Sequence, residues 1–379
     1  MKLKTSLVAT AASMALVCAS YSQTVIDVTG STAGRSAAIT NISALLDAGY
    51  TFAYYGKDAS ASKHDAGIYH GTYNGNAVII RTSWSGSAAG VRDVANAPQL
   101  DNSYIVKTQL GSTGGTYLGT VAAAPSGSFA PASAETVSEI GFSDVFQTST
   151  PFTSNTLVAE DEVAIIPFKF FANDGSTGIT NMTLLAFRNL YGALGEAPLS
   201  MWSGNPADSG TMVYATGRNN ESGTRITTLA ETGTGVFASI NQWKYTTIAS
   251  DTMAGVSFVG DDGYSSGSDV AKMMAAKSPV SQPGIYVGYI GASDWSTASS
   301  GGAVELSYNG VPYSIQAMQN GQYTFWGYLH QFRMNLSGTA LSFYNDLRDG
   351  ITAAPGSGLE TESSMNVLRP ADGAPVEPK

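Results

Sequence analysis

The sequence predicts an α/β protein with two domains, and three observations support this prediction. Short apolar runs rich in β-branched residues alternate with segments of helical periodicity along most of the chain. Loops of Gly, Ser and Thr connect several of these strands to a following helix, as in open α/β sheets. The length of 379 residues also suits two domains. The abundant Ser, Thr and Gly make an all-β protein the alternative, but five or more helical stretches favour α/β.

Charged residues are scarce, and their balance is acidic. They make up 13% of the chain, and 19 Lys and Arg against 29 Asp and Glu give a net charge of −10. A nucleic-acid-binding protein that neutralises phosphates with a basic face is therefore not favoured. The 42 glycines and the many Ser, Thr and Asn residues predict a surface that is polar but carries few charges.

The first 22 residues have the features of a signal peptide. Lys2 and Lys4 precede an apolar run over 6–17, and small residues then offer a cleavage site. The run is too short for a stable transmembrane helix, and no other segment reaches membrane length. We expect an exported protein in the periplasm or at the cell surface. Lipidation of Cys18, the only cysteine in the chain, remains an open alternative.

The predicted elements alternate along the mature chain. Strands are expected at 25–29, 51–55, 77–84, 139–143, 163–171, 212–216, 285–290 and 304–308. Helices are expected after Ser31 and after Ser87, and at 183–194, 222–229, 269–277, 313–318 and 339–347. The Gly- and Ser-rich stretch 96–134 is predicted to be an inserted loop or hairpin. Residues 351–379 are predicted to be a disordered tail.

Three loops share one design, in which a strand ends, small hydroxyl-bearing residues follow and a helix begins. They are Thr29–Ala33, Ser85–Gly90 and Arg218–Arg225. The first turn of a helix leaves backbone N–H groups unpaired, and the helix dipole adds partial positive charge there. Such loops can bind an anion, although Ser and Thr also occur there simply as helix caps.

The segment Gly217-Arg-Asn-Asn-Glu-Ser-Gly-Thr-Arg225 resembles the Arg-x-x-x-Ser-Gly-Thr loop of the periplasmic phosphate-binding proteins of ABC transporters. Val28-Thr-Gly-Ser-Thr32 is similar to the opening strand and loop of this family. Gly86-Ser-Ala-Ala-Gly-Val91 and Ile140-Gly-Phe-Ser-Asp144 are similar to two further family elements. Similar segments follow in the family's order almost to the end of the mature chain.

The resemblance implies a type II periplasmic-binding-protein fold, with a mixed sheet flanked by helices in each lobe. Lobe 1 would comprise 24–165 and 290–350, lobe 2 would comprise 166–289, and two crossover strands would form the hinge. The implied protein is a monomer without cofactor or metal. It would capture inorganic phosphate for an ABC permease in the inner membrane.

The phosphate ligands that the resemblance implies come from the three loops and from one carboxylate: Thr32, Ala33, Ser87, Asp144, Arg218, Ser222, Gly223 and Thr224. Asp144 would accept the proton of monohydrogen phosphate, HPO4. Sulfate has no such proton and would place negative charge against the carboxylate. Asp144 could instead be a turn or cap residue.

Three departures from the family pattern concern the ligand more than the fold. Ala33 stands where the family often has an aromatic residue, and Arg35 would add a cation if it points inward. The loop between Ser87 and Asp144 is much longer than the family's. Another oxyanion or a small anionic metabolite is therefore an alternative ligand.

Other functions are weaker alternatives. His64, Asp65 and His70 could suggest a metal site, but we expect them to be surface residues. No Gly-x-Ser-x-Gly turn stands between a strand and a helix in a convincing place, so an enzyme is not expected. A surface or structural protein that has kept the fold without transport is the alternative from a different class.

Overall fold

The computed structural model describes residues 23–55, 63–106 and 135–379. The predicted signal peptide, Cys18 and residues 107–134 of the predicted insertion lie outside these ranges. Within them, no helix combines the length and the apolar character needed to cross a bilayer.

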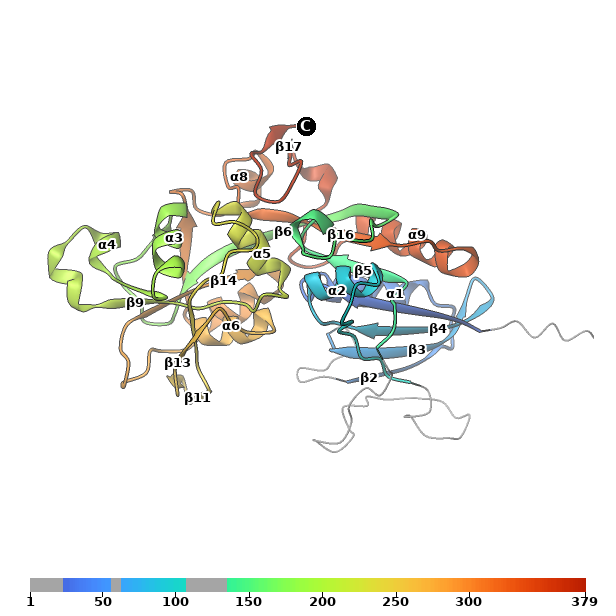
Figure 1. Ribbon diagram of the computed structural model, residues 1–379, viewed down its shortest axis with the longest axis horizontal. Helices are drawn as coiled ribbons and strands as arrows, with labels where there is room; N and C mark the ends of the chain where they lie inside the picture. Colours follow the sequence, from blue (N-terminus) through green and yellow to red (C-terminus); the bar gives the residue numbers. More distant parts are fainter. Residues whose placement is uncertain (1–22, 56–62, 107–134) are drawn as a thin grey trace, which may run out of the picture.

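One mixed sheet runs through the molecule in the order β2-β3-β4-β1-β5-β16-β6-β14-β9-β8, and the elements form two groups along it (Figure 1). The strands of the first group are β1 (Thr24–Gly30), β2 (Thr51–Tyr55), β3 (Ala66–Tyr73), β4 (Asn76–Ser83) and β5 (Ile140–Ser143). Its helices are α1 (Arg35–Leu45), α2 (Ser87–Val94) and α9 (Gly338–Ala353). β1 pairs in parallel with β4 and β5, so the loops after these strands meet at one edge of the sheet.

The second group contains both parallel and antiparallel strands. Its strands in the sheet are β7 (Asn181–Met182), β8 (Glu196–Pro198), β9 (Met212–Ala215), β14 (Ile285–Gly291) and β15 (Val304–Tyr308). Its helices are α3 (Leu184–Gly192), α4 (Ser200–Ser203), α5 (Gly223–Glu231), α6 (Gly267–Met274), α7 (Trp295–Ser300) and α8 (Ile315–Gln319). Two small hairpin sheets pair β10 (Gln242–Lys244) with β13 (Ser257–Gly260) and β11 (Thr247–Ala249) with β12 (Thr252–Ala254).

Two long strands connect the groups. β6 (Ala159–Ala172) pairs with β16 (Trp326–Arg333) through its first half, and with β14 and β15 through its second half. The described core is correspondingly continuous, since one cluster of buried side chains extends from Ile26 through Phe168 to Val213. The α/β prediction is confirmed by this sheet and its helices.

Several predicted details need correction. Ten strands of the described ranges were not predicted, and β3 and β16 are the longest of them, although β16 is buried along almost its whole length. Residues 290–319 had been assigned to the first lobe, but β14 extends to Gly291 and β15 pairs with β6 and β7 of the second group. The return of the chain to the first group therefore comes just before β16. In the predicted insertion, Tyr104 and Ile105 are fully buried. The hydroxyls of Tyr104 and Ser138 are hydrogen-bonded at 2.6 Å, and Ile105 packs in a small apolar cluster with Ala53 and Ile68.

Residues 354–379, which we call the C-terminal strap, are ordered and not the disordered tail predicted from their composition. Figure 1 shows them packed across the junction of the two groups. Within the strap, β17 (Val367–Leu368) pairs with β18 (Glu377–Pro378), and Glu360 pairs with Ile165 of β6. The side chain of Arg369 is buried and donates to Glu231 of α5 at 2.9 Å. Such buried anchors explain why a segment rich in Pro, Gly and Ser takes one conformation.

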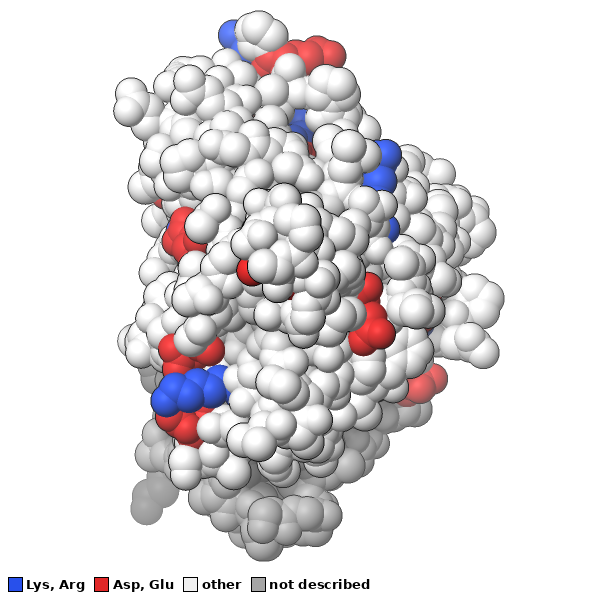
Figure 2. All heavy atoms as spheres, turned by 90° about the vertical axis from the view of Figure 1, so that its left-hand side faces the viewer, with Lys and Arg blue, Asp and Glu red and all other residues white. Residues whose placement is uncertain are grey.

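The surface agrees with the low charge content of the sequence. Figure 2 shows the end of the molecule formed by the second group, where Lys, Arg, Asp and Glu appear as isolated spots on an otherwise uncharged face.

Candidate functional site

Three loops converge on the carboxylate of Asp144, which follows β5. The hydroxyl of Ser31, in the loop between β1 and α1, donates to Oδ1 of Asp144. The hydroxyl of Thr224, in the first turn of α5, donates to Oδ2 at 3.2 Å. The backbone N–H of Asp144 donates to Oγ of Ser87, the first residue of α2, at 3.1 Å. The N-terminal ends of α1, α2 and α5 thus surround one carboxylate.

This carboxylate and the nearest cation are both buried. Asp144 is 2% exposed and Arg218 is 4% exposed. Burial raises the pKa of Asp144 above its usual value, against the opposing effects of the Ser31 hydroxyl, Arg218 and the other hydroxyls. Burial likewise lowers the pKa of Arg218, although the charges of Asp144 and Asp294 oppose this. The two groups stabilise each other as ions in a site of low polarity.

Backbone carbonyls hold the guanidinium of Arg218 in place. Its Nε donates to the carbonyl of Tyr264 at 3.1 Å, and its Nη2 donates to the carbonyl of Ser265 at 2.9 Å. The remaining nitrogen, Nη1, would lie 3.5 Å from a Cβ placed on Gly267. The side chain is therefore fixed by the second group, while Asp144 belongs to the first group.

Glycines allow the helices to come this close. A Cβ on Gly223 would lie 2.7 Å from Cβ of Asp144 and would collide with the Ser87 hydroxyl. Gly86 has a φ of 120°, and a Cβ there would lie 2.8 Å from the carbonyl oxygen of Glu221. Neither position accepts a larger residue without displacing α2 from α5.

The predicted ligand residues fall into three sets. The structure brings Ser87, Asp144, Arg218, Gly223 and Thr224 together; with Ser31 they form what we call the Asp144 cluster. Thr32 and Ala33 instead line an adjoining cavity. Ser222 acts as the N-cap of α5, because its hydroxyl accepts the N–H of Arg225 at 3.4 Å.

Ser31 was not among the predicted site residues. Its hydroxyl accepts the N–H groups of Ala33 and Gly34, at 3.1 and 3.2 Å, while it donates to Asp144. The sequence contained one signal for it, a hydroxyl directly after Gly30. In the structure Gly30 ends β1 with a φ of 118°.

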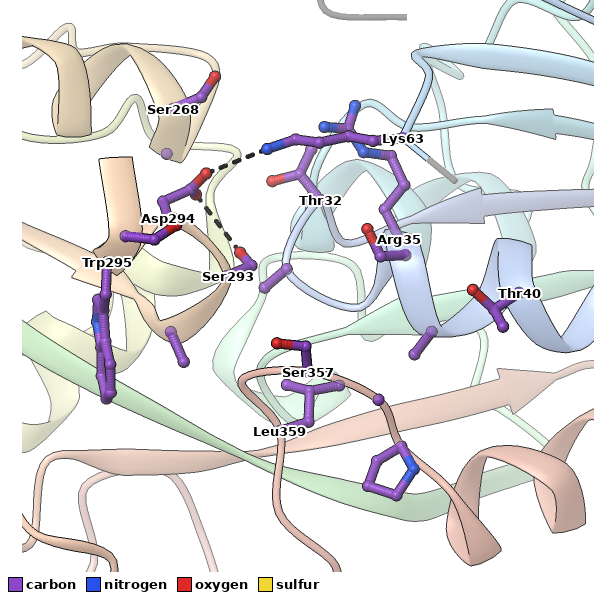
Figure 3. Close-up of a pocket in the computed structure, with 18 of the residues that line it drawn as sticks. Thr32, Arg35, Thr40, Lys63, Ser268, Ser293, Asp294, Trp295, Ser357 and Leu359 are labelled. Atoms are coloured by element: carbon purple, nitrogen blue, oxygen red, sulfur yellow. Dashed lines mark hydrogen bonds and ion pairs between the residues drawn. The ribbon is translucent and has the colours of Figure 1, made fainter. Parts of the chain in front are cut away.

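A cavity of about 560 Å³ lies beside the cluster, between the two groups of elements (Figure 3). The first group contributes Thr32, Arg35, Thr40 and Lys63, and the second contributes Ser268, Ser293, Asp294 and Trp295. Residues 354–357 and Leu359 of the strap also line the cavity. We call this space the Arg35 cavity.

Two ion pairs border the Arg35 cavity. Nη1 of Arg35 donates to Asp65 at 2.7 Å and to the carbonyl of His64 at 3.3 Å. Nζ of Lys63 lies 3.4 Å from Oδ1 of Asp294, so this pair connects the two groups (Figure 3). Arg35 therefore does point inward, the condition under which the sequence suggested an additional cation.

The expectation that His64 lies at the surface is wrong. His64, just before β3, is 1% exposed and stacks on the ring of Tyr54 at 5.5 Å between centroids. His330 is also buried, and burial lowers its pKa to about 3. In the described ranges, no group of three or more His, Cys, Asp or Glu side chains could hold a metal ion.

Comparison with known proteins gives structural similarity only. No protein-family model and no curated protein matches the sequence. The chain is similar in structure to a protein from Clostridium perfringens, named as a phosphate ABC transporter substrate-binding protein with bound phosphate. That match has 14% identity, covers 88% of this chain and 94% of that chain, and has a TM-score of 0.48.

Two other similar structures carry related names. PstS from Borrelia burgdorferi has 14% identity, coverage of 89% and 99%, and a TM-score of 0.43. An ABC-type phosphate transport receptor from Vibrio cholerae has 12% identity, coverage of 87% and 98%, and a TM-score of 0.46. At these identities the ligand of this chain has to be argued from its own residues.

Proposed function

We propose that this chain is an exported solute-binding protein that captures inorganic phosphate between its two groups of elements. The observation that carries the proposal is the convergence of three helix N-termini, Arg218 and several hydroxyls on the buried carboxylate of Asp144. Helix N-termini and an arginine favour an oxyanion. The carboxylate restricts the choice to an oxyanion that brings a proton.

Binding would proceed by exchange of hydrogen-bond partners. When the groups separate, Arg218 and Thr224 move away with the second group, while Ser31, Ser87 and Asp144 stay with the first. Phosphate then enters, and the hydroxyls that donate to Asp144 in this structure donate to phosphate oxygens instead. Asp144 accepts the proton of the HPO4 form. Thr32, Ala33, Ser222 and Gly223 would add hydroxyl and backbone N–H donors.

The two groups would act as lobes that close by hinge motion about β6 and β16. We place lobe 1 at 24–165 and 320–353 and lobe 2 at 166–319, which revises the boundaries expected from the sequence. Delivery to an ABC permease, action as a monomer and a binding role without catalysis belong to the same proposal.

Calorimetric titration of the mature protein tests the proposal. The protein is unfolded and refolded to remove bound ligand, and phosphate and sulfate are then titrated separately at neutral pH. We expect one-to-one binding of phosphate and no binding of sulfate. Equal binding of both anions would contradict the role of Asp144. Absence of binding in a folded sample would favour a surface or structural protein, and size-exclusion chromatography would check the monomeric state.

A further inference from the structure

The Arg35 cavity contains a buried cation whose hydrogen bonding is incomplete. Arg35 is 7% exposed, and its Nε has no hydrogen-bond partner among the described residues. Its Nη1 is engaged by Asp65 and His64, and Nε is closed off from the open space, so Nη2, which makes no hydrogen bond to a described residue, is the nitrogen left for an acceptor. An anionic oxygen that reaches Nη2 would gain a charge-assisted hydrogen bond.

The cavity is continuous with the loop that the proposed phosphate site uses. Thr32 and Ala33 line the cavity, while Ser31, directly before them, donates to Asp144. On the far wall, Gly267 lies between the two sites. A Cβ there would collide with Asp294 of the cavity and lie 3.5 Å from Nη1 of Arg218. The two sites therefore adjoin across Gly267 and the loop of Ser31 and Thr32.

The lining indicates what that group is. Arg35 and Lys63 supply positive charge, and around them lie side chains that can donate hydroxyl hydrogen bonds: Thr32, Ser36, Thr40, Ser266, Ser268, Ser293, Ser296 and Ser357. Their acidic partners Asp65 and Asp294 neutralise the cations while no anion is present. A volume of about 560 Å³ lies in the range of small-molecule sites and greatly exceeds one phosphate ion.

We propose that the site binds short inorganic polyphosphate, with the terminal phosphoryl in the Asp144 cluster and the next phosphoryl groups along Arg35 and Lys63. This inference rests on the proposed function, because it uses the same Asp144 cluster for the terminal phosphoryl. A terminal phosphoryl of polyphosphate retains a proton at neutral pH, as Asp144 requires. An organic phosphate monoester has largely lost that proton at pH 7, since its second pKa is near 6, and would be repelled.

The test is calorimetric titration of the mature full chain in metal-free buffer with inorganic phosphate, tripolyphosphate and glycerol 3-phosphate. We expect tripolyphosphate to bind at least about tenfold more tightly than phosphate, from the added charged hydrogen bonds. Glycerol 3-phosphate should bind more weakly than either. Equal affinity for phosphate and tripolyphosphate, or tightest binding of glycerol 3-phosphate, would overturn the inference but leave the proposed function intact. Failure of phosphate itself to bind would instead count against the proposed function.

Two variants assign the effect to the cavity. Arg35→Gln should lower the ratio of tripolyphosphate to phosphate affinity by about tenfold. Ser357→Trp should lower it as well, because Ser357 is exposed and lines the cavity, so that an indole there occupies ligand space. Ser363→Trp is the matched control, an exposed strap serine that is not part of the lining. An unchanged ratio in both cavity variants, each shown to be folded, would overturn the inference.

Discussion

The Asp144 cluster and the Arg35 cavity are neighbours with opposite construction. In the cluster, hydroxyls, a carboxylate and a guanidinium satisfy one another in a space that leaves no room for a methyl group on Gly223. In the cavity, the ion pairs of Arg35 and Lys63 border about 560 Å³ of open volume. Both regions lie at the boundary between the two groups of elements.

This difference gives the two regions different roles in binding. The cluster selects between anions, whereas the cavity offers room for a larger ligand. Asp144 acts where burial makes an unpaired charge costly, so a ligand without a proton is rejected strongly. Lys63 is partly exposed, so solvent and salt weaken its interaction with Asp294. Substitutions in the cluster should therefore have large effects, and substitutions around the cavity should have small effects on phosphate binding.

The largest effect is expected from Asp144→Asn, which tests whether the cluster selects by the proton. The amide carries no charge and can donate, so sulfate should bind and the ratio of phosphate to sulfate affinity should fall at least about 100-fold. Titration of both anions measures the ratio. Asp349→Asn, at an exposed position of α9, is the control. A ratio like that of the unmodified protein would show that Asp144 only shapes the turn.

A smaller effect is expected from Gly223→Ala, which tests the tight packing of the cluster. The methyl group would displace the Ser87 hydroxyl and Asp144, and overpacking of this kind should weaken phosphate binding about 5- to 150-fold. Gly192→Ala on α3 is the matched control, because nothing lies within 4 Å of a Cβ there. Equal phosphate affinities for the two alanine variants would mean that the cluster is looser than described.

The smallest effect is expected from Lys63→Met, which removes the ion pair of the partly exposed Lys63 with Asp294 between the two groups. Its contribution should be below about 1 kcal/mol, so phosphate affinity should change less than about fivefold. The change should also disappear at high salt concentration. Titrations at low and high salt measure it, and a change above tenfold that persists in salt would place Lys63 among the phosphate ligands.

The sequence predicted most strands of the large sheet and most helices, because their periodic patterns were local. β16 escaped prediction because its residues, Trp-Gly-Tyr-Leu-His-Gln-Phe-Arg, do not alternate between apolar and polar. Pairing on both sides, with β5 and β6, buries His330 and Gln331 alongside the aromatic side chains. Burial of this kind depends on distant strands, so a local pattern could not predict it.

The candidate site was predicted in the same uneven way. The motifs located Asp144, Ser87, Arg218 and Thr224, because each follows a recognisable strand end or helix start. They did not distinguish Ser31 from Thr32, since the choice between adjacent hydroxyls depends on the turn after Gly30. The roles of all these residues in binding remain predictions.

The burial of Arg369 makes the stability of α5 depend on the last residues of the chain. Glu231 on α5 has a side chain that is 7% exposed, and Arg369 near the end of the chain is its cation at 2.9 Å. Arg369 also donates to the carbonyls of Thr324 and Trp326 next to β16. A chain that ends before Arg369 leaves Glu231 as an uncompensated buried carboxylate, a defect that typically costs about 3–5 kcal/mol. The two groups of elements therefore reach their full stability only when the strap is in place, and a chain clipped before Arg369 should be degraded more readily by proteases.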